Sequence, residues 1–193
     1  IDTINAAALR SDITLNLEPG QISLLKGNRF QIAEGTIIEN AIGGDGNDTI
    51  TGNSADNQLQ GGRNRDSLIG GGGNDSLMGC GADRGLGTVD QLTGGAGSDL
   101  FVVGNGDSIF YGDATGNGAG LDDYAVIVDF AQAEDRIQLK GNSSQYSLGA
   151  SPIVGQLGAA LYVNRATGTD LIAIVQGTNP MDLNLAATYF NYV

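Results

Sequence analysis

The sequence contains no histidine, no tryptophan, a single cysteine and only three prolines. Without histidine, the Ser-His-Asp and Cys-His arrangements of hydrolases cannot form, and neither can an H-E-x-x-H zinc site. Cys80 has no second cysteine to pair with, so we interpret it as an incidental small residue and expect other interactions to hold the fold. These absences predict that the chain itself is not an enzyme.

Basic residues are also scarce, with nine Lys and Arg against 22 Asp and Glu, which gives a net charge of −13. This balance excludes the basic face that nucleic-acid binding requires, and it favours a chain that recruits cations. No apolar run approaches the roughly 18 residues of a membrane span. The chain starts at Ile1 without a Sec-type signal peptide, so we expect a fragment of a longer protein whose export is directed from elsewhere.

Glycine, by contrast, is abundant, with 32 residues out of 193, and much of it follows a nine-residue period. Six blocks can be written in this register, with the six residues Gly79–Arg84 interrupting the count after the fourth. The blocks are Gly43–Thr51, Gly52–Gln60, Gly61–Ile69, Gly70–Met78, Gly85–Thr93 and Gly94–Val102.

Two columns persist through the blocks. The sixth place holds an acid or an amide, namely Asp48, Asn57, Asp66, Asp75, Asp90 and Asp99. The eighth place holds an apolar residue, namely Ile50, Leu59, Leu68, Leu77, Leu92 and Phe101. The last three residues of a block are typical of a very short half-buried strand, and stacked coils would place the apolar residues in a ladder.

Stacking would also place the acids a strand spacing of about 4.8 Å apart, where like charges repel unless a cation lies between them. Carboxylate oxygens together with glycine carbonyls form an all-oxygen set of ligands, which favours Ca²⁺ over Zn²⁺, Cu²⁺ or Mg²⁺. Two other interpretations stay open. One is a flexible Gly/Asp-rich linker, and the other is a coil held by Asp and Asn hydrogen bonds without metal.

The pattern G-G-x-G-x-D-x-apolar-x resembles the repeats-in-toxin (RTX) family, whose nonapeptides bind calcium. Ile38–Gly44, Gly52–Asn57 and Leu59–Gly62 resemble the entry to the C-terminal domain of serralysin-type secreted metalloproteases. Asp99–Val102, Val128–Phe130 and Glu134–Leu139 resemble its exit, and Tyr189–Val193 resembles the tails of cyanobacterial RTX proteins. The resemblance implies an all-β fold, a parallel β-roll in which two nonapeptides complete one coil.

The resemblance further implies calcium ions shared between turns of alternate repeats. The expected pairs are Asp48 with Asp66, Asp66 with Asp90, Asp75 with Asp99 and, as a poorer site, Asn57 with Asp75. Backbone carbonyls at the first and third places would complete the shells, those of Gly43, Asp45, Gly61, Arg63, Gly70, Gly72 and Gly94. A further ion held by Asp123 and Asp129 would close the roll.

Some residues depart from the pattern. The side chains of Arg63 and Arg65 must point outward, since they would otherwise oppose a cation. Gly79–Arg84 either bulges from the roll or replaces the next turn, with Asp83 competing against Asp90.

The flanks predict three parts: capping strands in 1–42, the calcium-binding roll in 43–102, and an antiparallel C-terminal β cap with a possible secretion signal in 103–193. Strands are expected at Ile13–Leu17, Arg29–Ile32, Tyr124–Phe130 and Arg136–Lys140, with a hairpin of Leu161–Asn164 and Leu171–Gln176. Ile4–Arg10 and Pro180–Leu185 are modest helix candidates.

The resulting hypothesis is a calcium-triggered folding domain at the C-terminus of a secreted protein. By resemblance, its partners are calcium, a type I secretion apparatus and an upstream catalytic domain, which in a serralysin-like parent is a zinc metalloprotease. The alternative is a calcium-stiffened structural or adhesive module of an extracellular protein. The missing Asp before the last apolar residues weakens the match of the tail to serralysin secretion signals.

Overall fold

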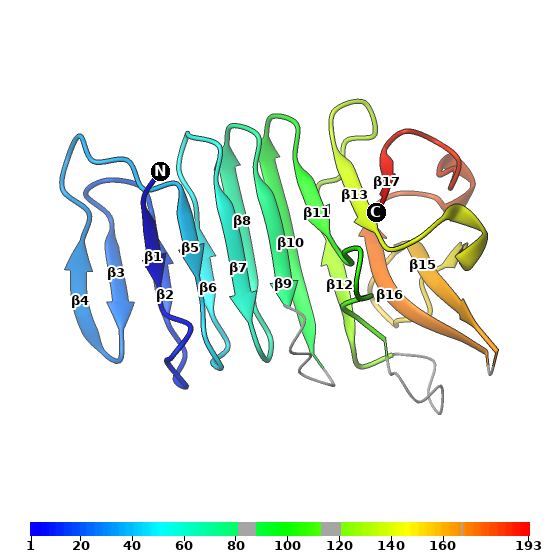
Figure 1. The fold of residues 1–193 in the computed structure, drawn as a ribbon, viewed down its shortest axis with the longest axis horizontal. Helices are drawn as coiled ribbons and strands as arrows, with labels where there is room; N and C mark the ends of the chain where they lie inside the picture. Colours follow the sequence, from blue (N-terminus) through cyan, green and yellow to red (C-terminus); the bar gives the residue numbers. More distant parts are fainter. Residues whose placement is uncertain (81–87, 113–120, 167) are drawn as a thin grey trace.

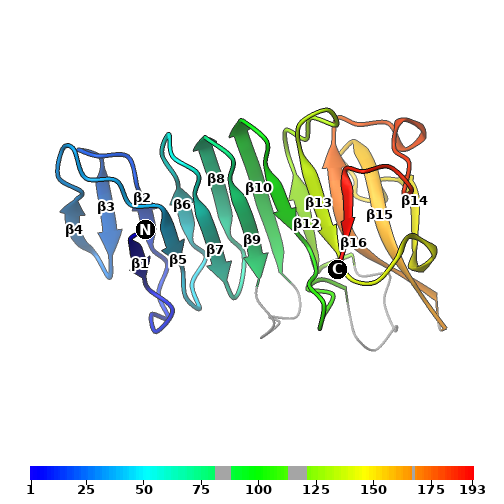
Figure 2. The ribbon, with the colours of Figure 1, turned by 45° about the horizontal axis from the view of Figure 1, so that its top comes forward.

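Two β-sheets run along the length of the molecule and face each other, as Figures 1 and 2 show. The computed structural model describes residues 1–80, 88–112, 121–166 and 168–193. Within these ranges, the secondary structure other than strands consists of two three-residue 3-10 helices, η1 (Ser143–Gln145) and η2 (Pro180–Asp182). No helix among the described residues is long and apolar enough to cross a bilayer.

The first sheet has seven strands, all parallel to one another. In spatial order they are β1 (Thr3–Asn5), β5 (Asn40–Ile42), β7 (Gln58–Gly62), β9 (Ser76–Cys80), β11 (Leu100–Val102), β13 (Arg136–Leu139) and β17 (Phe190–Tyr192).

The second sheet has ten strands, parallel in the middle and antiparallel at both ends. In spatial order they are β14 (Tyr146–Ala150), β15 (Gly158–Arg165), β16 (Gly168–Gln176), β12 (Tyr124–Ile127), β10 (Val89–Ala96), β8 (Ser67–Gly72), β6 (Thr49–Thr51), β2 (Thr14–Asn16), β3 (Ile22–Leu25) and β4 (Asn28–Gln31). The antiparallel pairs are β14–β15, β15–β16, β2–β3 and β3–β4.

Successive repeats alternate between the two sheets, so each residue lies beside its counterpart two repeats later, on the neighbouring strand of the same sheet. Ile50 is aligned with Leu68 in the second sheet, and Leu59 is aligned with Leu77 in the first. Each coil of the uninterrupted repeats therefore takes two nonapeptides, and the predicted parallel β-roll is confirmed.

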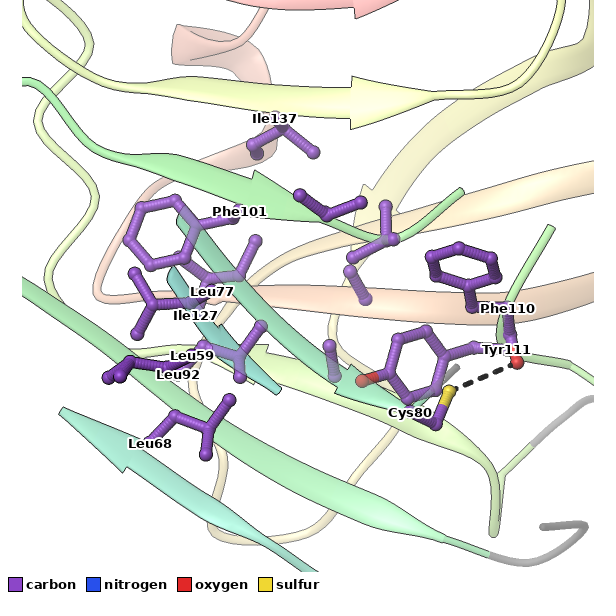
Figure 3. Packing of buried hydrophobic residues seen from close by; sticks show 14 of the residues in the cluster. Leu59, Leu68, Leu77, Cys80, Leu92, Phe101, Phe110, Tyr111, Ile127 and Ile137 are labelled. Atoms are coloured by element: carbon purple, nitrogen blue, oxygen red, sulfur yellow. Dashed lines mark hydrogen bonds between the residues drawn. The ribbon is translucent and has the colours of Figure 1, made fainter. Parts of the chain in front are cut away.

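The core consists of two facing ladders of apolar side chains. All six eighth-place residues are buried, with at most 2% of each exposed, and Figure 3 shows side chains of the two sheets meeting between them. The ladders continue beyond the repeats, to Leu15 and Ala41 at one end and to Ile127, Ile137 and Phe190 at the other. One buried residue per short strand suffices because each rests on its neighbours above and below.

The flanking strands lie where the sequence predicts them, but the two predicted helices do not form. β2 and β4 occupy the expected segments, and β15 and β16 form the expected hairpin. Ile4 lies in β1 beside Ala41 instead of in a helix, because ladder bonds outweigh the weak helix preference of so short a segment. At the second candidate only one turn forms, η2, capped by the Asn179 side chain.

Candidate metal sites at the turns

The turns between strands form two rows along the edges of the roll. We call each a corner and name it by its first-place glycine and its sixth-place residue. The six corners are Gly43–Asp48, Gly61–Asp66 and Gly79–Asp90 along one edge and Gly52–Asn57, Gly70–Asp75 and Gly94–Asp99 along the other.

Oxygen atoms from two coils converge at a corner. A Cβ atom added to Gly70 would lie 2.2 Å from Asp75 Oδ2 and 2.5 Å from the Gly94 carbonyl oxygen. At Gly61 the corresponding distances are 2.3 Å to Asp66 Oδ2 and 2.6 Å to the Gly79 carbonyl oxygen. Only glycine leaves this space open, and the atoms that face it are the hard oxygen ligands that Ca²⁺ prefers.

Each row is joined by hydrogen bonds from one sixth-place residue to the next. The backbone N–H of Asp48 donates to Asp66 Oδ1 at 2.8 Å, and that of Asp66 donates to Asp90 Oδ1 at 2.8 Å. On the other edge Asn57 donates to Asp75 at 2.7 Å, and Asp75 donates to Asp99 at 2.9 Å. The structure therefore brings together all four predicted pairs.

Two of these carboxylates keep an unpaired oxygen. Asp66 Oδ2 and Asp75 Oδ2 are buried and have no hydrogen-bond partner. Burial raises the pKa of Asp66 to about 9, with a further contribution from the neighbouring Asp90 and Asp48 carboxylates. Burial likewise raises the pKa of Asp75 to about 6. Because an unpaired buried carboxylate is costly, a cation at these corners would remove a large penalty.

The second-place residue decides whether a carboxylate is left unpaired. In the two N-terminal corners, the Gly44 N–H donates to Asp48 Oδ2 at 2.7 Å and the Asn53 N–H donates to Asn57 Oδ1 at 2.8 Å. Gly62 and Gly71 instead have φ of +125° and +110°, and their backbones pair with the neighbouring strands β9 and β10. Glycine tolerates this backbone, which leaves Asp66 and Asp75 without that donor.

The Gly52–Asn57 corner is closed by the protein's own groups. Asn57 Nδ2 donates to the Glu39 carbonyl oxygen at 3.1 Å, in addition to the bond that Oδ1 accepts from Asn53. A carboxylate could not donate to that carbonyl. The site of Asn57 with Asp75 was expected to be poorer, and the physical reason is that the Asn57 amide already has hydrogen-bond partners without a metal.

The interruption of the repeats is resolved at its beginning. Gly79, at the end of β9, lies opposite Asp90 in the same way as the other first-place glycines lie opposite their sixth-place residues. Gly79 and Cys80 continue the ladder of β7, because the alignment of Gly62 with Cys80 extends β9 past the repeat boundary. Asp83 and Gly85 lie outside the described residues.

Asp123 and Asp129 do not form one site, contrary to the prediction. Asp123 precedes β12 and accepts a bond from Thr88 Oγ1 at 3.1 Å, whereas Asp129 follows β12. Asp129 accepts bonds from the N–H groups of Gly94 and Gly95, both at 2.9 Å. An extended strand of about 3.3 Å per residue separates the two acids, so Asp129 belongs to the Gly94–Asp99 corner.

Asp135 is a member of the row that sequence reasoning missed. Its Oδ1 accepts a bond from the Asp99 N–H at 3.0 Å, and its Oδ2 accepts one from the Ala131 N–H at 2.7 Å. The signal is present in the sequence, because Asp135 stands two residues before the buried Ile137 as a sixth-place acid stands before the eighth place. The irregular spacing after Val102 hid it.

The third-place residues lie at the rim of the corners. Arg63 is half-exposed, with its Nε 3.9 Å from Asp45 Oδ1, and Arg65 is exposed, so both arginines point outward as predicted. The Gly72 N–H donates to the Asn53 carbonyl oxygen at 2.9 Å.

Within the described part of the chain, no group of three or more His, Cys, Asp or Glu residues could hold a metal ion. Any metal at the corners must therefore also use backbone carbonyls.

Comparisons with known proteins agree with this geometry. A family model described as the RTX calcium-binding nonapeptide repeat matches residues 41–79 and 84–115. The serralysins of Photorhabdus laumondii subsp. laumondii and Photorhabdus luminescens are each 45% identical to this chain over 62 residues. That match covers 31% of this chain and 13% of each serralysin. The repeats of this chain are RTX calcium-binding nonapeptide repeats, distantly similar to part of serralysin.

Proposed function

We propose that this chain is a calcium-triggered folding domain of a secreted protein. The observation that carries the proposal is the pair of buried, unpaired carboxylate oxygens of Asp66 and Asp75, each facing a glycine carbonyl of the next coil. RTX repeats bind Ca²⁺ as part of their structure, and the donor atoms found here suit that ion.

Two interior corners are the strongest candidates for holding ions. Asp66 with the Gly79 carbonyl would hold one, and Asp75 with the Gly94 carbonyl would hold another. Bound calcium would supply the positive charge that the corners lack. Asp48 and Asn57 would position these acids through their N–H groups, and the apolar ladders would exclude water from beneath them.

Calcium binding is coupled to folding in this proposal. The unfolded chain carries a net charge of −13 and has few apolar residues in its repeats, so it gains too little from collapse when calcium is scarce. An ion that binds only the folded corners adds its binding free energy to the stability of the roll. Residues 43–102 would respond to calcium, with 1–42 and 103–193 as caps.

The wider setting follows from the similarity to serralysin and is part of the proposal. A chain that stays unfolded in calcium-poor cytosol can be threaded through a type I secretion apparatus and fold outside. A catalytic domain upstream, of the zinc metalloprotease type, would be the parent's active part.

An extracellular spacer is the second candidate. It is favoured by the ladders that run without a break from β1 to β17, which make the molecule an extended two-sheet body. An H-E-x-x-H motif upstream of this chain would support the protease setting, whereas tandem sandwich domains or further repeats would support the spacer.

A calcium titration followed by circular dichroism tests the proposal. We expect β-structure to appear with Ca²⁺ and not with the same concentration of Mg²⁺. Asp75→Asn removes one ligand charge and should raise the calcium midpoint roughly tenfold or more. Asp122→Asn makes the same charge change at an exposed residue and should leave the midpoint unchanged. Equal midpoints for both variants would contradict the role of Asp75, and a spectrum indifferent to calcium would overturn the proposal.

A further inference from the structure

The Gly79–Asp90 corner differs from the other corners of its row. At Gly61, the space beside the glycine is shared by Asp66 Oδ2 and the Gly79 carbonyl oxygen of the next coil. At Gly79, a Cβ atom would lie 2.4 Å from Asp90 Oδ2 and 2.3 Å from the hydroxyl oxygen of Tyr111. A tyrosine hydroxyl thus stands where the preceding corners place a backbone carbonyl.

Tyr111 changes the chemistry of this corner because a hydroxyl can donate a hydrogen bond and a carbonyl cannot. Its hydroxyl donates to Asp90 Oδ2 at 2.8 Å, while Oδ1 accepts the Asp66 N–H at 2.8 Å. Both carboxylate oxygens of Asp90 therefore have donors, whereas Asp66 has a donor on Oδ1 only. A carboxylate satisfied in this way has little to gain from a cation.

The tyrosine is held firmly in this position. Tyr111 is fully buried, and its backbone neighbour Phe110 accepts a bond from Cys80 Sγ at 3.3 Å, as Figure 3 shows. The ring belongs to the hydrophobic core, and its hydroxyl lies beside Gly79, where the preceding corners present the carbonyl of the next coil.

We propose that Tyr111 closes the Gly79–Asp90 corner to calcium, so that the row of ions on this edge ends at the Gly61–Asp66 corner. The inference rests on the proposed calcium function and makes it more specific. Asp90 is then the last acid of this row. It accepts a hydrogen bond from the Tyr111 hydroxyl and contributes no oxygen to an ion.

Counting bound ions by native mass spectrometry at saturating Ca²⁺ tests the proposal. Asp90→Asn should carry as many ions as the unmodified chain, whereas Asp66→Asn should carry at least one fewer. Loss of an ion from Asp90→Asn would overturn the closure, because it would place Asp90 among the ligands. An unmodified chain that binds no calcium at all would overturn the proposed function instead, so the two failures are distinguishable.

Tyr111→Phe gives a second, independent measurement. It keeps the ring but removes the donor, so Asp90 Oδ2 becomes an unpaired buried oxygen. The thermal midpoint of the calcium-loaded chain should fall by roughly 3–10 °C with the ion count unchanged. A Tyr111→Phe chain that loses an ion would show that the hydroxyl is a calcium ligand, and an unchanged midpoint would show that the bond to Asp90 is not formed.

Discussion

The roll and the C-terminal hairpin hold their strands together in different ways, although the hairpin continues the second sheet of the roll. In the roll (Gly43–Val102), each nonapeptide places its eighth-place apolar side chain in the core, and a polar side chain is buried two residues before it. In the hairpin (Gly158–Gln176), six successive residues of β16 are buried, and five of them are apolar. The hairpin is therefore stabilised by apolar burial, whereas the roll buries acidic side chains inside its turns.

The treatment of buried acids makes the contrast sharper. In the hairpin, the buried Asp170 pairs with the side chain of Arg165. Among the described residues, none of the ion pairs involves Asp66 or Asp75. The hairpin thus supplies a counter-charge for its buried acid and the roll supplies none for these two, so we expect the calcium dependence to lie in the roll.

Removing calcium should produce the largest effect. We expect chelation with EGTA at neutral pH to abolish amide protection throughout Gly43–Val102, while β14, β15 and β16 keep part of theirs. Hydrogen exchange measured by mass spectrometry with and without calcium reports both regions at once. Equal loss of protection in roll and hairpin would contradict the contrast between them.

Acid should partly replace calcium in the roll. Burial raises the pKa of Asp66 to about 9 from 3.8, and raises those of Asp75 and Asp90 to about 6. Without calcium, the folded state therefore binds more protons than the unfolded state between about pH 4 and pH 9. The stability contributed by these acids is present below about pH 4 and is lost as the pH rises through the folded-state values.

The calcium-free roll should thus be more folded at about pH 5 than at about pH 8, as measured by denaturant titration with a chelator present. Asp66→Asn should weaken this dependence because it removes the group with the largest shift. Calcium binding should show the opposite trend and strengthen with pH, since protons compete for the same oxygens. Stability of the calcium-free roll that rises from about pH 5 to about pH 8 would contradict the argument.

Gly70→Ala should break a single corner. The added methyl group would lie 2.2 Å from Asp75 Oδ2 and 2.5 Å from the Gly94 carbonyl oxygen, and the backbone carbonyl cannot move aside cheaply. We expect a loss of about 3 kcal/mol of stability in calcium, together with a higher calcium midpoint. Gly106→Ala is the matched control, because a Cβ there meets nothing within 4 Å. If both variants unfold at the same denaturant concentration, the corner is not close-packed.

The sequence predicted those parts of the molecule that depend on a strict period. The eighth-place column gave the buried ladder, and the sixth-place column gave the pairs Asp48 with Asp66 and Asn57 with Asp75, because in a solenoid the period alone fixes which residues stack. The hairpin was also visible, since two apolar segments flank a short turn.

Features set by local geometry were not predictable in the same way. That Gly62 and Gly71 withhold an N–H from their acids depends on a backbone dihedral, and that Tyr111 reaches Asp90 depends on contacts across 21 residues. A single site for Asp123 and Asp129 was implied by the family resemblance and not by the positions of these residues in the repeat. The strand between them carries the two acids to opposite ends of β12.

The smallest change should come from the hairpin. Ile174 is fully buried in β16 and packs in a cluster with Tyr124, Val126, Ala160 and Leu171. Ile174→Val removes one methylene group and should cost about 1 kcal/mol in the calcium-loaded chain. The calcium midpoint should stay within twofold of the unmodified value, because Ile174 lies in β16 and no corner lies in that strand. Thermal unfolding and calcium titration of the same sample separate the two quantities. A calcium midpoint that moves as far with Ile174→Val as with Gly70→Ala would mean that roll and hairpin fold as one unit, and that calcium acts on the whole sheet instead of on its turns.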